Sequence, residues 1–235
     1  MAAVNAAAGT ITILVGAVLL RLTIGGTYER YVKASLGPWL VVAGIAVILL
    51  GAATLFRALR PGRVDGDDHE HERDHEHGIG VGWLLLAPIA ALLLVAPPTL
   101  GSFGVGRAAT VDVRAGAPVF QRLGRGSDPL PMSLLEFAQR AFDHDGTSFN
   151  GRAVQLTGFV AGAEAGGFRL ARYTIACCAA DAAPVVVRVV GTVGDRAPRD
   201  QWLTVTGKFR SGDSDLPELA ATSVAEIRPP NDPYE

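Results

Sequence analysis

Three long apolar runs near the amino terminus constrain the fold of this chain more than any other feature. The run at residues 38–56 reads PWLVVAGIAVILLGAATLF and contains no charged residue, and runs of similar length occupy residues 6–24 and 79–97. A helix rises about 1.5 Å per residue, so about 20 apolar residues cross the hydrocarbon core of a lipid bilayer. Because lipid offers the backbone no hydrogen-bonding partner, we expect each run to be a transmembrane helix.

The composition agrees with a chain that lies partly in a nonpolar solvent. Hydrophobic residues make up 49% of the 235 residues and charged residues only 19%, below the share usual in globular proteins. A cleaved signal peptide is the alternative for the first run. Such a peptide carries basic residues before its apolar segment, whereas the first basic residue here is Arg21, near the end of the run. We therefore favour a multi-pass protein of the plasma membrane.

Basic residues beside the spans predict the orientation. Three spans put the amino terminus and residues 57–78 on one side, and the first loop and the carboxy-terminal half on the other. The basic counts on the two sides are nearly equal, but Arg57, Arg60 and Arg63 cluster directly after the second run. Positive charge is enriched in cytoplasmic loops, so this cluster predicts that residues 57–78 are cytoplasmic and that the carboxy-terminal domain is extracytoplasmic.

The character of the chain changes after residue 104, where charged residues become frequent and apolar runs shorten. We divide it into a membrane domain at residues 1–104, a linker at 105–131 and a soluble domain at 132–235. Residues 132–142 have helical periodicity, and Ser133 with Glu136 has the spacing of a capping box. Five runs that alternate like half-buried strands follow, at residues 152–160, 167–171, 185–190, 202–209 and 219–227.

These patterns predict an α+β membrane protein. Its three amino-terminal transmembrane helices are followed by a small soluble OB-like β-barrel domain with one preceding helix. OB barrels that bind oligonucleotides present stacking aromatic residues among clustered Lys and Arg. With 21 basic against 23 acidic residues, this chain has a net charge of −2, so we expect no nucleic-acid partner.

A loop rich in histidine and acidic residues lies at residues 57–78, between the second and third runs. It contains the stretch DGDDHEHERDHEHG, which holds four of the five histidines: His69, His71, His75 and His77. Imidazole nitrogens bind zinc and other divalent transition metals, and a flexible segment can gather several around one ion. We predict weak metal binding, for example of zinc. The alternative is a solvated acidic connector without a metal.

The two cysteines are adjacent, in the stretch ACCAAD. Three interpretations remain open for them. Cys177, Cys178 and Asp181 are candidate ligands of a soft metal ion, the two thiols are candidates for a vicinal redox disulfide, and the pair can equally pack as small apolar side chains beside a turn. The sequence contains no recognisable catalytic triad, phosphate-binding glycine loop or zinc-protease helix. We therefore expect no catalytic residues and no enzymatic activity.

The chain also resembles a known family, the YcgQ-like family of permease subunits. In that family a short membrane-spanning half, a His-rich loop and a small β-rich domain occur together. The residues that carry the resemblance are FNGR at 149–152, GFV at 158–160, RYTI at 172–175, CC and AD within 177–181, WLTVTG at 202–207 and RPPNDPY at 228–234. The resemblance implies a membrane protein paired with a larger, multi-span permease-like membrane protein.

Taken with the resemblance, these features predict an accessory subunit of a membrane permease or transport system that handles metal ions. Two other functions are compatible with the same residues. The chain would be a membrane-anchored metal sensor or buffer if the loop and the cysteine pair were its active parts. It would be a thiol-based redox membrane protein if the cysteine pair cycled between thiols and a disulfide.

Overall fold

The computed structural model divides the chain into two compact units. One comprises Met1–Tyr28 and Ser35–Pro98, and the other comprises Glu29–Ala34 and Thr99–Glu235. The third predicted span and all four histidines of the predicted loop lie outside the described part of the chain. The described residues are 2–60, with side chains from residue 6, and 100–107, 120–124, 126, 128–191, 197–212 and 214–235.

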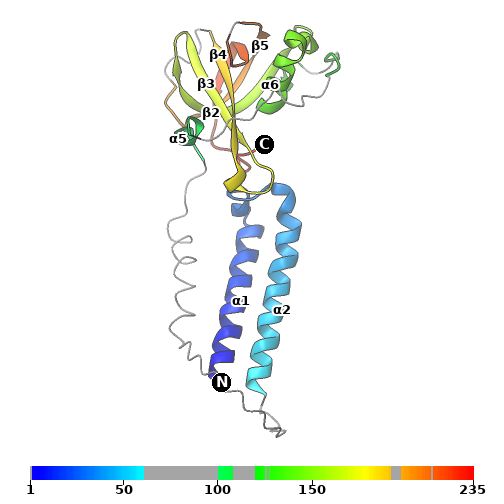
Figure 1. The fold of residues 1–235 in the computed structure, drawn as a ribbon, viewed down its shortest axis with the longest axis vertical. Helices are drawn as coiled ribbons and strands as arrows, with labels where there is room; N and C mark the ends of the chain where they lie inside the picture. Colours follow the sequence, from blue (N-terminus) through cyan, green and yellow to red (C-terminus); the bar gives the residue numbers. More distant parts are fainter. Residues whose placement is uncertain are drawn as a thin grey trace. The chain divides into compact units, whose positions relative to one another are not determined.

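The described residues of the first unit form two apolar helices joined by a short connection. Helices α1 (Ala2–Ile24) and α2 (Gly37–Leu59) run antiparallel and side by side (Figure 1). The short 3-10 helices η1 (Thr27–Arg30) and η2 (Ala34–Leu36) lie between them in the chain. The segments Ala6–Ile24 and Ala34–Leu59 are long and apolar enough to cross a membrane. The first two predicted spans are therefore helical.

Glycines bring α1 and α2 into backbone contact. Gly9 and Gly16 on α1 face Gly51 and Gly44 on α2. A Cβ built on Gly9 or on Gly16 would lie 3.0 Å from the carbonyl oxygen of the facing glycine. The glycines on each helix are seven residues apart, about two turns, so they form one stripe along the contact. Small residues of this kind allow helices in lipid to pack closely.

The outward face of this hairpin is apolar. Charged side chains are scarce along both helices, and large hydrophobic residues are exposed instead. The exposed residues are Leu14, Ile24, Trp39, Val42, Ile45, Leu49, Leu50, Phe56 and Leu59. A run of exposed apolar side chains of this extent is unusual on a protein surface that faces water.

A six-stranded sheet lies at the centre of the second unit. Its hydrogen-bonded order is β1-β2-β3-β4-β6-β5, and β2 also pairs with β5, so the five strands β2 to β6 form a closed circuit of neighbours. The β4–β6 pair is parallel, and the other pairs of this circuit are antiparallel. The strands are β1 (Leu130–Pro131), β2 (Ala153–Glu164), β3 (Gly167–Thr174), β4 (Ala183–Val190), β5 (Trp202–Arg210) and β6 (Glu218–Glu226).

The alternation of apolar residues located the five longer strands correctly. Each predicted run overlaps one strand, because the inward side chains of each strand are buried in the core of the domain. The short strand β1 has no such pattern. Its two residues pair in parallel with Val154 and Gln155 of β2, and two residues are too few to show periodicity.

The helix predicted at residues 132–142 is α6 (Leu134–Phe142), and it covers the core. Its residues Leu134, Phe137 and Ala138 are buried in one cluster with the inward residues of the sheet. The hydroxyl of Ser133 accepts a hydrogen bond from the backbone N–H of Glu136 at 3.0 Å, which caps the helix. The carboxylate of Glu136 accepts instead from Nε of Arg140, at 2.8 Å. Only the Ser133 half of the predicted capping box is therefore formed.

A buried carboxylate joins the three strands at the parallel pair. Glu218 begins β6 and is 4% exposed, opposite Arg188 on β4 and Arg210 on β5. Its Oε1 lies 3.1 Å from Nη1 of Arg188, and its Oε2 lies 2.7 Å from Nη2 of Arg210. Two guanidinium groups therefore neutralise one buried carboxylate at this position.

Candidate thiol and carboxylate site

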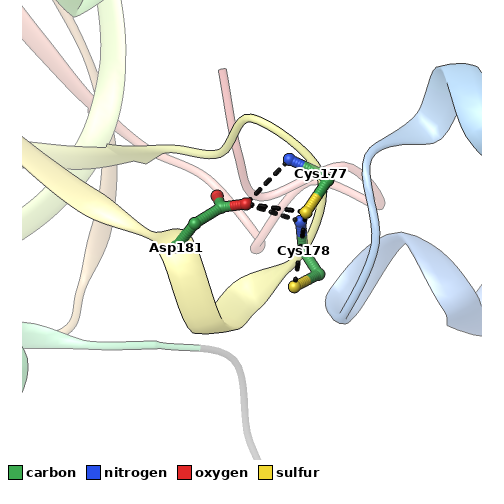
Figure 2. A group of neighbouring side chains, drawn as sticks. All are labelled: Cys177, Cys178 and Asp181. Atoms are coloured by element: carbon green, nitrogen blue, oxygen red, sulfur yellow. Dashed lines mark hydrogen bonds between the residues drawn. The ribbon is translucent and has the colours of Figure 1, made fainter.

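The turn between β3 and β4 folds around one carboxylate. We call residues 176–181 the thiol turn; it ends in the 3-10 helix η4 (Ala179–Asp181). Asp181 Oδ1 accepts the backbone N–H of Ala176 at 2.8 Å. Its Oδ2 accepts those of Cys177 at 2.9 Å and Cys178 at 3.2 Å (Figure 2). The carboxylate thus satisfies three successive N–H groups and fixes the backbone that carries both cysteines.

The two thiols and the carboxylate converge. Sγ of Cys177 lies 2.9 Å from Oδ2 of Asp181 and 3.7 Å from Sγ of Cys178. One ligand atom from each of the three residues lies within 4.8 Å of the other two. Both cysteines are free; Cys177 is exposed and Cys178 is half-buried. The structure therefore brings together the three site residues that were predicted in the soluble domain.

The contact with Asp181 controls the protonation of Cys177. The thiol donates a hydrogen bond to the carboxylate, and this bond, with smaller contributions from Cys178 and burial, raises the pKa of Cys177 to about 11. The same bond and the backbone N–H groups lower the pKa of Asp181 well below its usual range. A thiolate, and not a thiol, is the nucleophile in disulfide exchange, so this arrangement suppresses thiol reactivity near neutral pH.

The segment between the two apolar helices is part of this site. We call residues 29–34 the inter-helix segment. The N–H of Lys33 donates to the carbonyl of Cys177 at 3.1 Å, and the N–H of Ala179 donates to the carbonyl of Tyr31 at 2.7 Å. Val32 and Cys178 form an antiparallel bridge. The thiol turn is therefore held from one side by Asp181 and from the other by the inter-helix segment.

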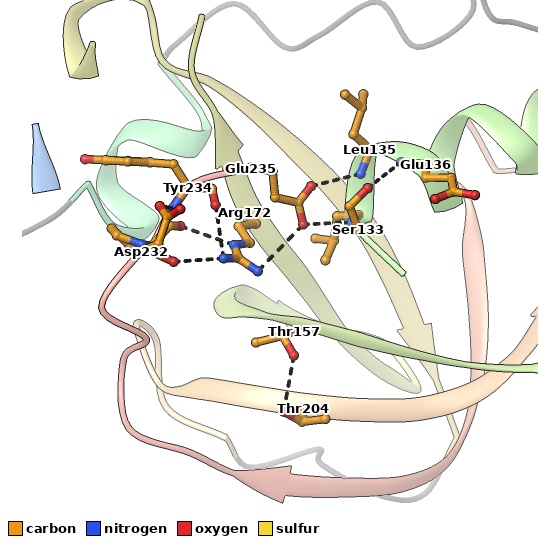
Figure 3. Close-up of polar contacts among 11 residues, drawn as sticks. Ser133, Leu135, Glu136, Thr157, Arg172, Thr204, Asp232, Tyr234 and Glu235 are labelled. Carbon is orange, nitrogen blue, oxygen red and sulfur yellow. Dashed lines mark hydrogen bonds and ion pairs between the residues drawn. The ribbon is translucent and has the colours of Figure 1, made fainter. Parts of the chain in front are cut away.

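A second polar cluster anchors the carboxy-terminal residues to the domain (Figure 3). Arg172 on β3 donates to the carbonyls of Asp232, Pro233 and Tyr234, at 2.9 to 3.3 Å. Glu235 accepts the N–H groups of Leu134 at 2.8 Å and Leu135 at 3.1 Å, at the first turn of α6. Burial raises the pKa of Glu235, although both N–H groups and Arg172 act in the opposite direction.

This second cluster joins two stretches that carried the family resemblance, the one at Arg172 and the carboxy-terminal one. Tyr234 extends the cluster to the inter-helix segment, because its hydroxyl donates to the carbonyl of Arg30 at 2.8 Å. Sequence reasoning did not anticipate these contacts. They join residues 60 or more positions apart, and no local pattern specifies a partner at that distance.

The second unit is thus a domain in which strands β2 to β6 form a closed circuit and the β3–β4 connection is the thiol turn. In the sequence it is joined to two apolar helices. A DUF1980 C-terminal domain, from an uncharacterised family, is found at residues 137–235. The match includes β2 to β6, the thiol turn and the carboxy-terminal residues that contact Arg172. No curated protein and no solved structure matches the chain.

Proposed function

We propose that this chain is an accessory subunit of a membrane transport system that handles metal ions, working beside a multi-span permease-like membrane protein. The observation that carries the proposal is the hydrogen bonding of the inter-helix segment to the thiol turn. It joins the connection between two apolar helices to a domain that displays candidate metal ligands. The YcgQ-like resemblance supports the permease-like partner.

The same contact supports a topology with three spans. If α1 and α2 cross the membrane, the inter-helix segment and the domain that it contacts lie on one side. The chain leaves that side at α2 and must return to it before Leu100, where the described residues resume. The apolar run at residues 79–97 is long enough for this return. The Arg57, Arg60 and Arg63 cluster favours an extracytoplasmic position for the domain.

The order of the strands supports an OB-like barrel for the domain. Strands β2, β3 and β4 follow one another, β6 pairs in parallel with β4, and β5 closes the circuit between β6 and β2. This order of neighbours is the one expected of a five-stranded Greek-key barrel of the OB type, which we propose for the domain.

A membrane-anchored metal sensor or buffer is the second candidate function. It is favoured by the contact of the thiol turn with the inter-helix segment, because a change at the thiols would be transmitted to the connection between the helices. The redox alternative uses the same two thiols; because Asp181 holds the Cys177 thiol in its protonated form, both disulfide exchange and metal binding require the loss of that proton.

Purification of the full-length chain from membranes in a mild detergent tests the proposed function. We expect a multi-span membrane protein to co-purify in a fixed ratio, and metal accumulation by the cells to change when either protein is deleted. A chain that purifies alone, and whose deletion leaves metal accumulation unchanged, would contradict the accessory-subunit function. The sensor function instead predicts a metal-dependent response without any change in transport.

A further inference from the structure

We propose that Cys177 and Cys178 bind one tetrahedral cation of the zinc class through both sulfur atoms, with Asp181 as a positioning residue. This inference rests on the proposed function, in which the domain handles metal ions. It names the class of ion, the ligand atoms and the open character of the site.

The distance between the two sulfur atoms selects the geometry of the ion. Two Zn–S bonds of about 2.3 Å that meet at the tetrahedral angle place their sulfur atoms about 3.8 Å apart. Bonds of the same length to a linear, two-coordinate ion would place them about 4.6 Å apart. The observed separation of Sγ of Cys177 and Sγ of Cys178 is 3.7 Å. At this separation the two thiols are hydrogen-bonded to each other, and it is close to the tetrahedral value, so the pair needs little movement to hold such an ion.

Asp181 has a different role from the two sulfurs. Its Oδ2 lies 2.9 Å from Sγ of Cys177, which is a hydrogen-bond distance. An oxygen and a sulfur on one tetrahedral zinc ion lie about 3.6 Å apart, given the usual bond lengths. This oxygen also accepts the N–H groups of both cysteines. Asp181 thus holds the backbone that presents the thiols, and its negative charge attracts the cation.

Binding exchanges protons for the cation. Each thiol loses its proton to solvent, two S–H bonds break and two metal–sulfur bonds form, without any change of oxidation state. The ion then has two protein ligands from this turn, so its other two positions are open to water or to ligands from outside it. Cys177 is exposed, which lets an ion enter and leave. Such an open site suits transfer of an ion better than permanent structural binding.

A cobalt titration of the full-length protein in detergent tests this inference, because cobalt substitutes for zinc and a cobalt–thiolate bond gives a charge-transfer absorption. The titration uses a variant in which His69, His71, His75 and His77 are all replaced by Ala, to remove the predicted loop ligands. We expect one cobalt ion per chain with thiolate absorption, displaced by zinc. Cys177→Ser and Cys178→Ser should each weaken binding at least tenfold, without a change in the circular dichroism spectrum.

The outcomes separate this inference from the proposed function. Absence of thiolate absorption would overturn the cation site, and so would serine variants that bind cobalt as tightly as the parent protein. Asp181→Asn should weaken binding but keep the thiolate absorption, whereas a ligand role for Asp181 would change the spectrum. Co-purification of a permease-like protein with the serine variants tests the proposed function independently. If the two cysteines bind no cation in the parent protein but the complex co-purifies, only this inference is rejected; if they bind the cation but no complex is found, only the proposed function is rejected.

Discussion

The backbone N–H of Lys33 donates to the carbonyl of Cys177 at 3.1 Å, across more than 140 positions of sequence. This bond, with the reciprocal one from Ala179 to Tyr31, attaches the connection between α1 and α2 to the turn that carries both thiols. The backbone of Cys177 is thereby fixed by Asp181 through its N–H and by Lys33 through its carbonyl. The position of the thiols and that of the inter-helix segment are therefore coupled.

Replacing Lys33 by proline should weaken cation binding at the thiol turn. Lys33→Pro removes the backbone donor together with the lysine side chain; loss of the donor costs about 1 kcal/mol, which corresponds to about a fivefold lower affinity for cobalt. Lys33→Ala keeps the N–H and serves as the control, with an unchanged affinity. If the alanine variant lost as much affinity as the proline variant, the backbone bond would not be the cause.

Replacing Glu218 by alanine should destabilise the soluble domain. The change leaves Arg188 and Arg210 without their shared partner at the β4–β6 and β5–β6 pairs. Because both arginines keep some exposure to solvent, we expect a loss of about 2–3 kcal/mol in the free energy of unfolding, below the value for a fully buried pair. Denaturant unfolding followed by the fluorescence of buried Trp202 measures it.

Glu226→Ala is the matched control for this prediction. Glu226 ends the same strand but is exposed, so the change should alter the free energy of unfolding by less than about 0.5 kcal/mol. Equal losses in the two variants would show that the strand, and not the ion cluster, determines the effect.

Enlarging a glycine in the stripe between α1 and α2 should separate the helices. Gly44→Leu puts a side chain where a Cβ already meets Leu20 at 2.7 Å, and overpacking of this kind costs about 1–3 kcal/mol. Ala46→Leu, on the exposed face of the same helix, adds similar bulk without a clash. Thermal unfolding in detergent, followed by helical circular dichroism, should show a lower midpoint only for Gly44→Leu.

The buried carboxylate of Glu235 should make the stability of the domain depend on pH. Burial raises its pKa in the folded state, so the folded chain retains this proton to a higher pH than the unfolded chain. The free energy of unfolding should therefore fall as pH rises from the ordinary carboxyl range through the raised pKa. Glu235→Gln removes the titration and should flatten this part of the stability profile; an identical slope would exclude Glu235 as its source.

Local patterns in the sequence located the first two apolar helices, helix α6 and the five longer strands correctly. The alternation at residues 202–209 and the helical spacing of Leu134, Phe137 and Ala138 each reflect burial of one face in the larger hydrophobic cluster of the domain. Periodicity reports such burial directly. The first two apolar runs likewise became helices, because their composition leaves no polar face.

The parts that local patterns did not specify are contacts between distant residues. The spacing of Cys177, Cys178 and Asp181 predicted which residues form the site. It did not predict that the carboxylate accepts hydrogen bonds from three backbone N–H groups, because these bonds depend on the conformation of the turn. The helix cap by Glu235 crosses about 100 positions. The inter-helix segment has no strand-like alternation, so nothing in it indicated its pairing with Cys178.

The sidedness of three positions tests the central claim most directly. Single cysteines placed at Glu29, at His71 and after Glu235, in a background with Cys177→Ser and Cys178→Ser, are labelled in intact cells with a membrane-impermeant maleimide. We predict labelling at position 29 and after Glu235, and protection at position 71 until the membrane is permeabilised. Labelling of positions 29 and 71 together, or opposite results for position 29 and the carboxy terminus, would contradict the proposed anchoring of the domain.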